Sequence, residues 1–311
     1  MKINSINTNF SIYKNLKQRT FSNKVRNDVF VKTEQVSFGK KKKSRIDIIN
    51  DFAKNVKKYY IDNDFDINEI KKLVQKDVKD VSVKDFKELK SPYPLPSDFM
   101  GAYTEEIDYD SDLDLVSSGQ KTLYLKNPKD AEYTKIAYYA NCVHEFTHLV
   151  QNADPQLSAV AHLNKLINKS KAPVSVKEQS VILAPEFAIE VEKAIKKPIH
   201  DSLNNTVLFD KYWNKRPTVT EVYKDNGIDN IKKFANSVMN EKVETFTKKY
   251  GELDPMILKE YSLMHLQREN EAYQVDFNAH KKINPKIFDA PYEWDKVAKV
   301  QLYRILADLK I

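Results

Sequence analysis

The sequence of 311 residues contains a single cysteine, Cys142, so no internal disulfide can form. It has only five glycines, which favours helices over sheets with many tight turns. No run approaches the roughly 18 apolar residues that a membrane span needs, and the N-terminus lacks the apolar core of a secretory signal peptide. These absences predict a soluble protein that is cytoplasmic or is exported by a route independent of a signal peptide.

Positive charge is concentrated in residues 1–45, which hold 12 Lys and Arg against two acids, a net charge of +10. The other 266 residues hold 39 basic and 42 acidic side chains, a net charge of −3. Asn, Ser and Lys dominate the first segment, which is typical of disordered chain. Its four consecutive lysines, Lys40–Lys43, can bind nucleic acid or an anionic membrane. We therefore expect residues 1–45 to be a basic, disordered arm, with contact to nucleic acid or an anionic membrane as the alternative to a solvated tail.

Downstream of the arm, hydrophobic periodicity predicts a helical cap over residues 46–90, built from two or three short amphipathic helices that include 82–90. Three prolines in "SPYPLPSDF" then interrupt regular structure. The segment "QKTLYLK", residues 120–126, alternates as a strand with one buried face does. We expect this strand to belong to a small sheet.

A long helix is predicted from Asn127-Pro128, an N-cap followed by a proline at the first helical position, to a stop at Pro155. Further helical patterns follow over 156–170, 176–197, 228–250, 255–282 and 293–310. The predicted fold is α+β and predominantly helical. A domain over 91–311 would combine a sheet and helix in 91–155 with a helical C-terminal lobe in 156–311.

The long helix contains "VHEFTHLVQ", with the H-E-x-x-H pattern at His144, Glu145 and His148. Residues four apart on a helix lie about 40° apart in projection, so both imidazoles can reach one ion. Glu145 is rotated by about 100° and is placed to act on a water molecule bound to that ion. Zinc lowers the pKa of such a water, and a carboxylate can take its proton as it attacks a carbonyl. The spacing predicts a zinc site with Glu145 as catalytic base.

"VHEFTHLVQ" resembles the active-site helix of zincin metallopeptidases and is similar to the bacterial group with the pattern H-E-[LF]-T-H-x-x-Q. The resemblance implies a zincin-like fold, a zinc cofactor and a peptide or protein substrate. It also implies that the strand before the helix presents its edge to an extended substrate. "QKTLYLKNP", immediately upstream, fits that strand, because a peptide backbone can add to such an edge.

Zinc bound by two histidines needs a third protein ligand and one open position. "LMHLQRENEAYQVDF" resembles the E-x-x-A-[DN] signature of the gluzincin branch, which places Glu269 in the ligand position and Glu271 as a close alternative. Helical phase favours Glu269, because it shares an apolar face with Leu266 and Ala272. A carboxylate on such a face needs a partner, and a metal would be one.

Three other acids remain alternative ligands. Asp154 occupies the ligand position of the metzincin branch, although Gln151 replaces the glycine of that motif. Glu186 and Glu190 lie one turn apart on a predicted helix. On the helix with Glu269, four residues are candidates for orienting a ligand or stabilising an oxyanion: His265, Tyr273, Asp276 and His280. Tyr273 stands where the gluzincin signature has an acid or amide, and Asp276 can take over that role.

The sequence thus predicts a zinc metalloendopeptidase with His144, His148 and Glu269 as ligands. The alternative is a catalytically inactive zincin-fold binding or effector module, recruited through the basic N-terminal arm.

Overall fold

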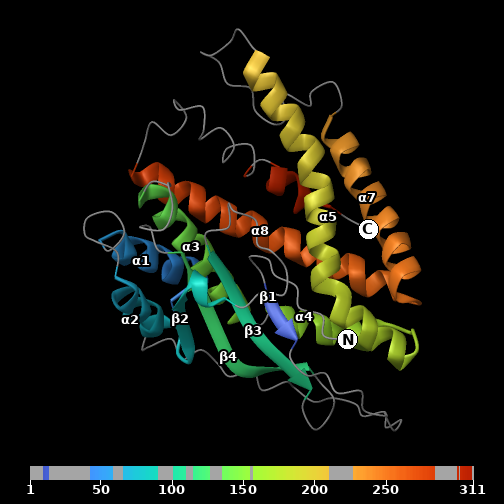
Figure 1. The fold of residues 1–311 in the computed structure, drawn as a ribbon, viewed down its shortest axis with the longest axis horizontal. Helices are drawn as coiled ribbons and strands as arrows, with labels where there is room; N and C mark the ends of the chain where they lie inside the picture. Colours follow the sequence, from blue (N-terminus) through green and yellow to red (C-terminus); the bar gives the residue numbers. More distant parts are fainter. Residues whose placement is uncertain are drawn as a thin grey trace.

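The computed structural model describes a helical protein with a small sheet in the N-terminal half of the chain (Figure 1). The described residues are 10–13, 43–58, 66–89, 101–109, 115–126, 135–154, 157–209, 227–283, 300 and 302–309. Among the helices in these ranges, none combines the length and apolarity that crossing a membrane would take.

Two of the helices expected in the cap are present. Helix α1 (Arg45–Lys57) begins at Ser44, whose side chain accepts a hydrogen bond from the backbone N–H of Asp47. Helix α2 (Ile67–Asp77) begins at Asp66, which caps it in the same way. Both helices bury apolar residues in the core that contains the sheet, so the expected cap and the sheet share one core.

The prediction of a helix over residues 82–90 is wrong. Val81–Asp85 form strand β2, and Phe86–Glu88 form a short 3₁₀ turn. Val81 and Val83 are buried while Ser82 and Lys84 are less so, which is the two-residue alternation of a strand. β-Branched residues on the buried face favour this conformation over a helix.

The sheet has the order β1-β3-β4-β2 and is mixed. Strands β3 (Gly101–Tyr109) and β4 (Leu115–Leu125) are antiparallel, and β2 pairs with β4 in parallel. Strand β4, which precedes the helix with the H-E-x-x-H motif, is therefore central, and the expectation that it presents an edge is wrong. Strand β2, which the sequence predicts as a helix, pairs with residues 121–125 of β4 and so covers that edge of β4. Leu123 and Thr122, on opposite faces of β4, are both buried, as in a central strand.

The fourth strand comes from the N-terminal arm. Strand β1 (Phe10–Tyr13) pairs in parallel with residues 104–107 of β3. The disorder expected of the arm therefore does not extend to residues 10–13. Residues 1–9 and 14–42, which include most of the lysine run, lie outside the described residues, as does the predicted helix start at Asn127-Pro128.

The remaining helices follow the expected pattern closely. They are α3 (Lys135–Asn152), α4 (Ala159–Lys169), α5 (Val174–Phe209), α7 (Gly227–Tyr250) and α8 (Pro255–Ile283), with further helix over 302–306. The largest difference is the end of α5, which continues through Pro198 to Phe209, whereas the pattern predicts an end at residue 197. A proline within a helix removes one backbone hydrogen bond, and the 36 residues of α5 contain two prolines, Pro185 and Pro198.

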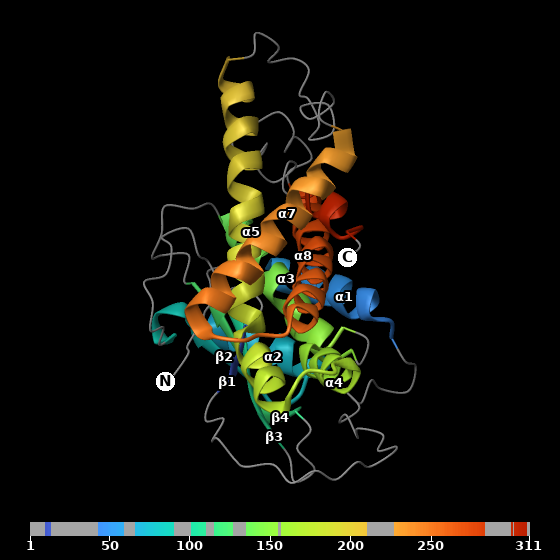
Figure 2. The same cartoon turned by 90° about the vertical axis from the view of Figure 1, so that its right-hand side faces the viewer.

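Two hydrophobic cores meet at the pair formed by α3 and α8. One core joins α1, α2, the sheet and α3, and the other joins α4, α5, α7 and most of α8. In Figure 1 the sheet lies below α8 while α5 and α7 rise on the right, and in Figure 2 α3 and α8 again lie side by side. This pairing brings the H-E-x-x-H motif of α3 against the polar residues of α8.

Candidate metal centre

The H-E-x-x-H motif lies in the interior because helix α3 is covered by α1 on one side and by α8 on the other. Phe146 stacks on Phe52 of α1, with ring centroids 3.7 Å apart. On the side facing α8, His144 and His148 are 4% and 0% exposed. Polar side chains buried to this degree need partners, and α8 supplies them.

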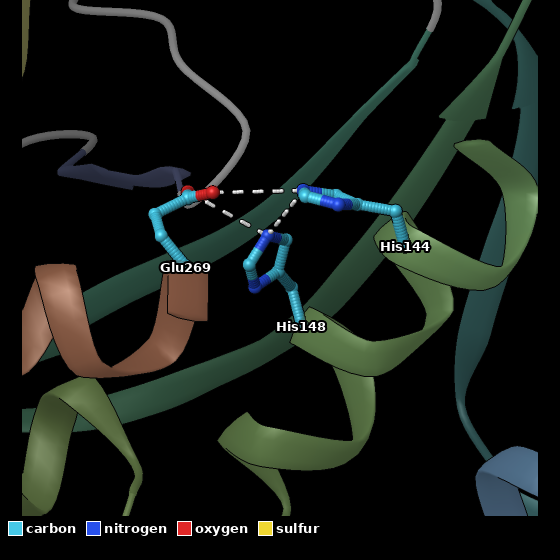
Figure 3. Close-up of side chains that lie close together, drawn as sticks. All are labelled: His144, His148 and Glu269. Atoms are coloured by element: carbon cyan, nitrogen blue, oxygen red, sulfur yellow. Dashed lines mark hydrogen bonds and ion pairs between the residues drawn. The ribbon is translucent and has the colours of Figure 1, made fainter. Parts of the chain in front are cut away.

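The side chains of His144, His148 and Glu269 point toward one another (Figure 3). The Nε2 atoms of the two histidines lie 3.1 Å apart. The carboxylate oxygens of Glu269 lie 3.6 Å from Nε2 of His144 and 3.7 Å from Nε2 of His148. Ligands about 2.0–2.1 Å from one tetrahedral ion would lie about 3.3 Å from each other. The structure therefore brings the three predicted ligands to the spacing that a shared ion requires.

Gln151 sets the orientation of the His148 ring. Its Oε1 lies 2.9 Å from Nδ1 of His148, and its Nε2 donates to the backbone oxygen of Arg268 at 3.0 Å and to Glu271 at 2.8 Å. Because the amide nitrogen is committed to two acceptors, Oε1 must accept the hydrogen bond from Nδ1–H. The proton of a neutral His148 is thereby held on Nδ1, and the Nε2 lone pair faces Glu269. In the sequence Gln151 is the last letter of the H-E-[LF]-T-H-x-x-Q pattern and a misfit to the metzincin glycine, and neither feature assigns it this role.

The two histidines differ in charge preference. Burial, with the neighbouring His144 and Arg268, lowers the pKa of His148 well below its usual range. Burial also opposes the charged form of His144, but the hydrogen bond and negative charge of Glu269 outweigh it and raise the pKa of His144. His148 is therefore neutral near pH 7, which is the state that binds a metal.

Glu145 is fully buried, and neither of its carboxylate oxygens has a hydrogen-bond partner among the described residues. Burial raises its pKa to about 8, because the charged carboxylate loses its solvation. The backbone of β3 packs directly on it: a Cβ added at Gly101 would lie 2.7 Å from Cγ of Glu145 and from Nδ2 of Asn141. Glycine at 101 thus allows the sheet to approach the side chain of Glu145.

The four alternative ligands contact residues outside the group of His144, His148 and Glu269. Asp154 and Glu271 both form ion pairs with Arg45 at the start of α1. Glu186 accepts a hydrogen bond from Tyr250, and Glu190 lies near Lys193 and Lys242. None of the four belongs to a potential metal-binding group found among the described residues.

The predicted companions on α8 differ in their contacts. The Tyr273 ring meets the His144 ring edge-on, with centroids 4.8 Å apart. Asp276 and His280 are buried further along α8. His265 instead contacts Glu192 of α5, with Nε2 of His265 2.7 Å from Oε2 of Glu192.

Glu192 is absent from the residues that the sequence predicts. A usable signal exists, since Ala188, Val191 and Ile195 are apolar neighbours on the same helical face. Helical phase, which selects Glu269 on α8, would select Glu192 on α5 for the same reason.

No family model, no curated protein and no solved structure matches the chain.

Proposed function

We propose that the chain is a zinc-dependent metallopeptidase in which His144, His148 and Glu269 hold the metal. The observation that supports this most directly is the convergence of two Nε2 atoms and one carboxylate, 3.1 to 3.7 Å apart, beside a buried glutamate. Two histidines and one glutamate form a donor set of catalytic zinc sites, which keep a fourth position open. When bound, zinc would lower the pKa of a water molecule and polarise the substrate carbonyl.

Glu145 is the residue proposed to move protons. It follows His144 directly on α3, and its two oxygens have no partner among the described residues that would compete for a proton. A neighbouring positive ion favours the charged form of a carboxyl group, so a bound metal would lower the raised pKa of Glu145. The carboxylate would then take the proton of a water molecule and return it to the leaving amine. His144, His148 and Glu269 orient the metal, while Gln151 keeps the lone pair of His148 directed at it.

A second candidate is a binding module with a closed, structural zinc site, recruited through the basic arm. The observation that favours it is burial, since His144 is 4% exposed and Glu145, His148 and Glu269 are each 0% exposed. Structural zinc sites leave no coordination position for a water molecule, whereas a peptidase must admit water and substrate.

The Glu145→Gln variant separates the two candidates. Zinc content and cleavage of an unfolded protein substrate would be measured for the full chain and for the variant, with and without chelator. A peptidase binds one zinc in both forms and loses cleavage only in the variant. One zinc in both forms without cleavage in either supports the closed site, and no zinc in either form rejects both candidates.

A further inference from the structure

Glu192 of α5 is a buried acid that the proposed hydrolysis does not use. Both of its carboxylate oxygens are occupied. Oε2 lies 2.7 Å from Nε2 of His265, and Oε1 accepts a hydrogen bond from the hydroxyl of Tyr303. Burial alone would raise the pKa of Glu192, but these contacts hold the pKa below its usual value. A charged group is therefore kept inside the helical lobe by two specific partners.

Each partner of Glu192 leads to one of the three proposed ligands. The Tyr303 ring stacks on the Tyr273 ring, with centroids 4.6 Å apart and planes 18° apart. Tyr273 in turn meets the ring of His144 edge-on at 4.8 Å. This series of contacts runs from α5 through the C-terminal helical residues 302–306 and α8 to α3.

The second connection runs along α8. His265 lies one helical turn before Glu269, and one donor atom each from Glu192, His265 and Glu269 lie within 4.8 Å of one another. These three residues also have the composition of a metal site, but the contacts favour a different role. Both oxygens of Glu192 are engaged by His265 and Tyr303, and the oxygens of Glu269 face His144 and His148.

We propose that Glu192 is a positioning residue of the metal centre, acting on His144 through Tyr303 and Tyr273 and on Glu269 through His265. The inference rests on the zinc site of the proposed function. Metal ligands depend on the groups hydrogen-bonded to them for orientation, and losing such a group typically weakens metal affinity about 10- to 100-fold. Glu192 acts through intervening side chains, so its loss lies at the lower end of this range. Glu192 supports two ligands at once, so its replacement disturbs both sides of the site.

The test compares two Tyr–Glu pairs that share helix α5. Glu192→Gln keeps the shape of the side chain but removes its charge, and Tyr303→Phe removes only the hydroxyl. The matched controls are Glu186→Gln and Tyr250→Phe, because the Tyr250 hydroxyl donates to Glu186 at 3.0 Å away from the metal centre. All are made in the full chain, and thermal unfolding of the metal-free proteins reports whether each folds.

Zinc affinity and stoichiometry are measured by competition with a chelator, and the visible spectrum of the Co²⁺-loaded protein reports ligand geometry. We expect one zinc per chain throughout, about 10-fold weaker binding in Glu192→Gln, and a smaller loss in Tyr303→Phe. Both variants should alter the Co²⁺ spectrum, and both controls should bind as the unaltered protein does.

Unaltered affinity and spectrum in a folded Glu192→Gln variant would overturn the proposal. If Glu192→Gln does not fold, unaltered zinc affinity and an unaltered Co²⁺ spectrum in Tyr303→Phe would overturn the proposal instead. Two ions in the unaltered protein and one in Glu192→Gln would also reject it, by making Glu192 a ligand. Absence of zinc from the unaltered protein is a separate result, which rejects the proposed function itself.

Discussion

Gln151 Oε1 accepts a hydrogen bond from Nδ1 of His148 at 2.9 Å, one turn after the H-E-x-x-H motif. The guanidinium of Arg268 also donates to this oxygen, with its Nε at 3.3 Å, so the amide is held from both sides. The final glutamine of "HEFTHLVQ" thus lies behind a proposed ligand, where it fixes which ring nitrogen faces the metal.

Replacing Gln151 with Leu should therefore weaken zinc binding about 10- to 100-fold. Leucine fills a similar volume but cannot accept the proton of Nδ1, so His148 loses its preferred tautomer. The control is Gln179→Leu, because the Gln179 amide donates to the backbone oxygen of Tyr250 in an exposed position. Zinc titration of both variants is the measurement, and equal affinities would show that Gln151 does not orient His148.

The third ligand can be tested by single substitutions. Glu269→Ala removes one of the three donors and should abolish tight zinc binding, because two histidines alone do not complete a site. Glu186→Ala and Glu190→Ala remove acids that pair elsewhere and should leave affinity unchanged. Tight binding that survives in Glu269→Ala would mean that another acid completes the site.

The H-E-x-x-H spacing and the apolar phase of α8 are local properties, so the sequence alone predicts that His144, His148 and Glu269 share one centre. The expected helices of the C-terminal lobe are likewise present, because their periodicity is long and regular. Short segments are less informative. Residues 82–90 contain lysines and apolar residues at spacings that fit a helix, yet Val81 and Val83 pair with β4.

Long-range partners were beyond the reach of sequence patterns. The central place of β4 depends on β2, whose residues 81–85 pair with residues 121–125, 40 positions further along the chain. The contact between Glu192 and His265 joins residues 73 positions apart. Local periodicity can place each of these side chains on a buried face, but only the packing of α5 against α8 makes them partners.

The stability of the metal-free protein should depend on Glu145. Its pKa is raised from 4.5 to about 8 in the folded state, so the folded protein retains a proton that the unfolded chain releases. The free energy of unfolding therefore falls as pH rises between about 4.5 and 8, because ionising the buried carboxyl group is harder in the folded state. Glu145→Gln cannot ionise and should lose less stability over the same range.

Denaturant unfolding of both metal-free proteins at pH 5.5 and pH 8 measures this difference. Each pKa unit corresponds to about 1.4 kcal/mol, so the unaltered protein should lose a few kcal/mol more than the variant. Parallel losses in the two proteins would show that Glu145 ionises as readily as in the unfolded chain.

We expect that a glycine is needed at position 101 because it leaves room for the side chain of Glu145, not because the backbone there has a φ that other residues avoid. In Gly101→Ala the new Cβ would approach Cγ of Glu145 to 2.7 Å and the backbone oxygen of Tyr124 to 3.1 Å, so α3 or β3 must shift. Such overpacking typically costs about 1–3 kcal/mol. Because the displaced side chain is the proposed base, peptide hydrolysis should fall further than the loss of folded protein explains.

Gly251→Ala is the matched control, since Gly251 has φ of +92° and no atom within 4 Å of an added Cβ. It should lower stability through backbone strain by about 1 kcal/mol and leave the activity per folded molecule unchanged. Comparing hydrolysis per folded molecule separates the two effects. If both glycine variants retain equal specific activity, the close approach of β3 has no bearing on Glu145, and the glycine at 101 serves packing alone.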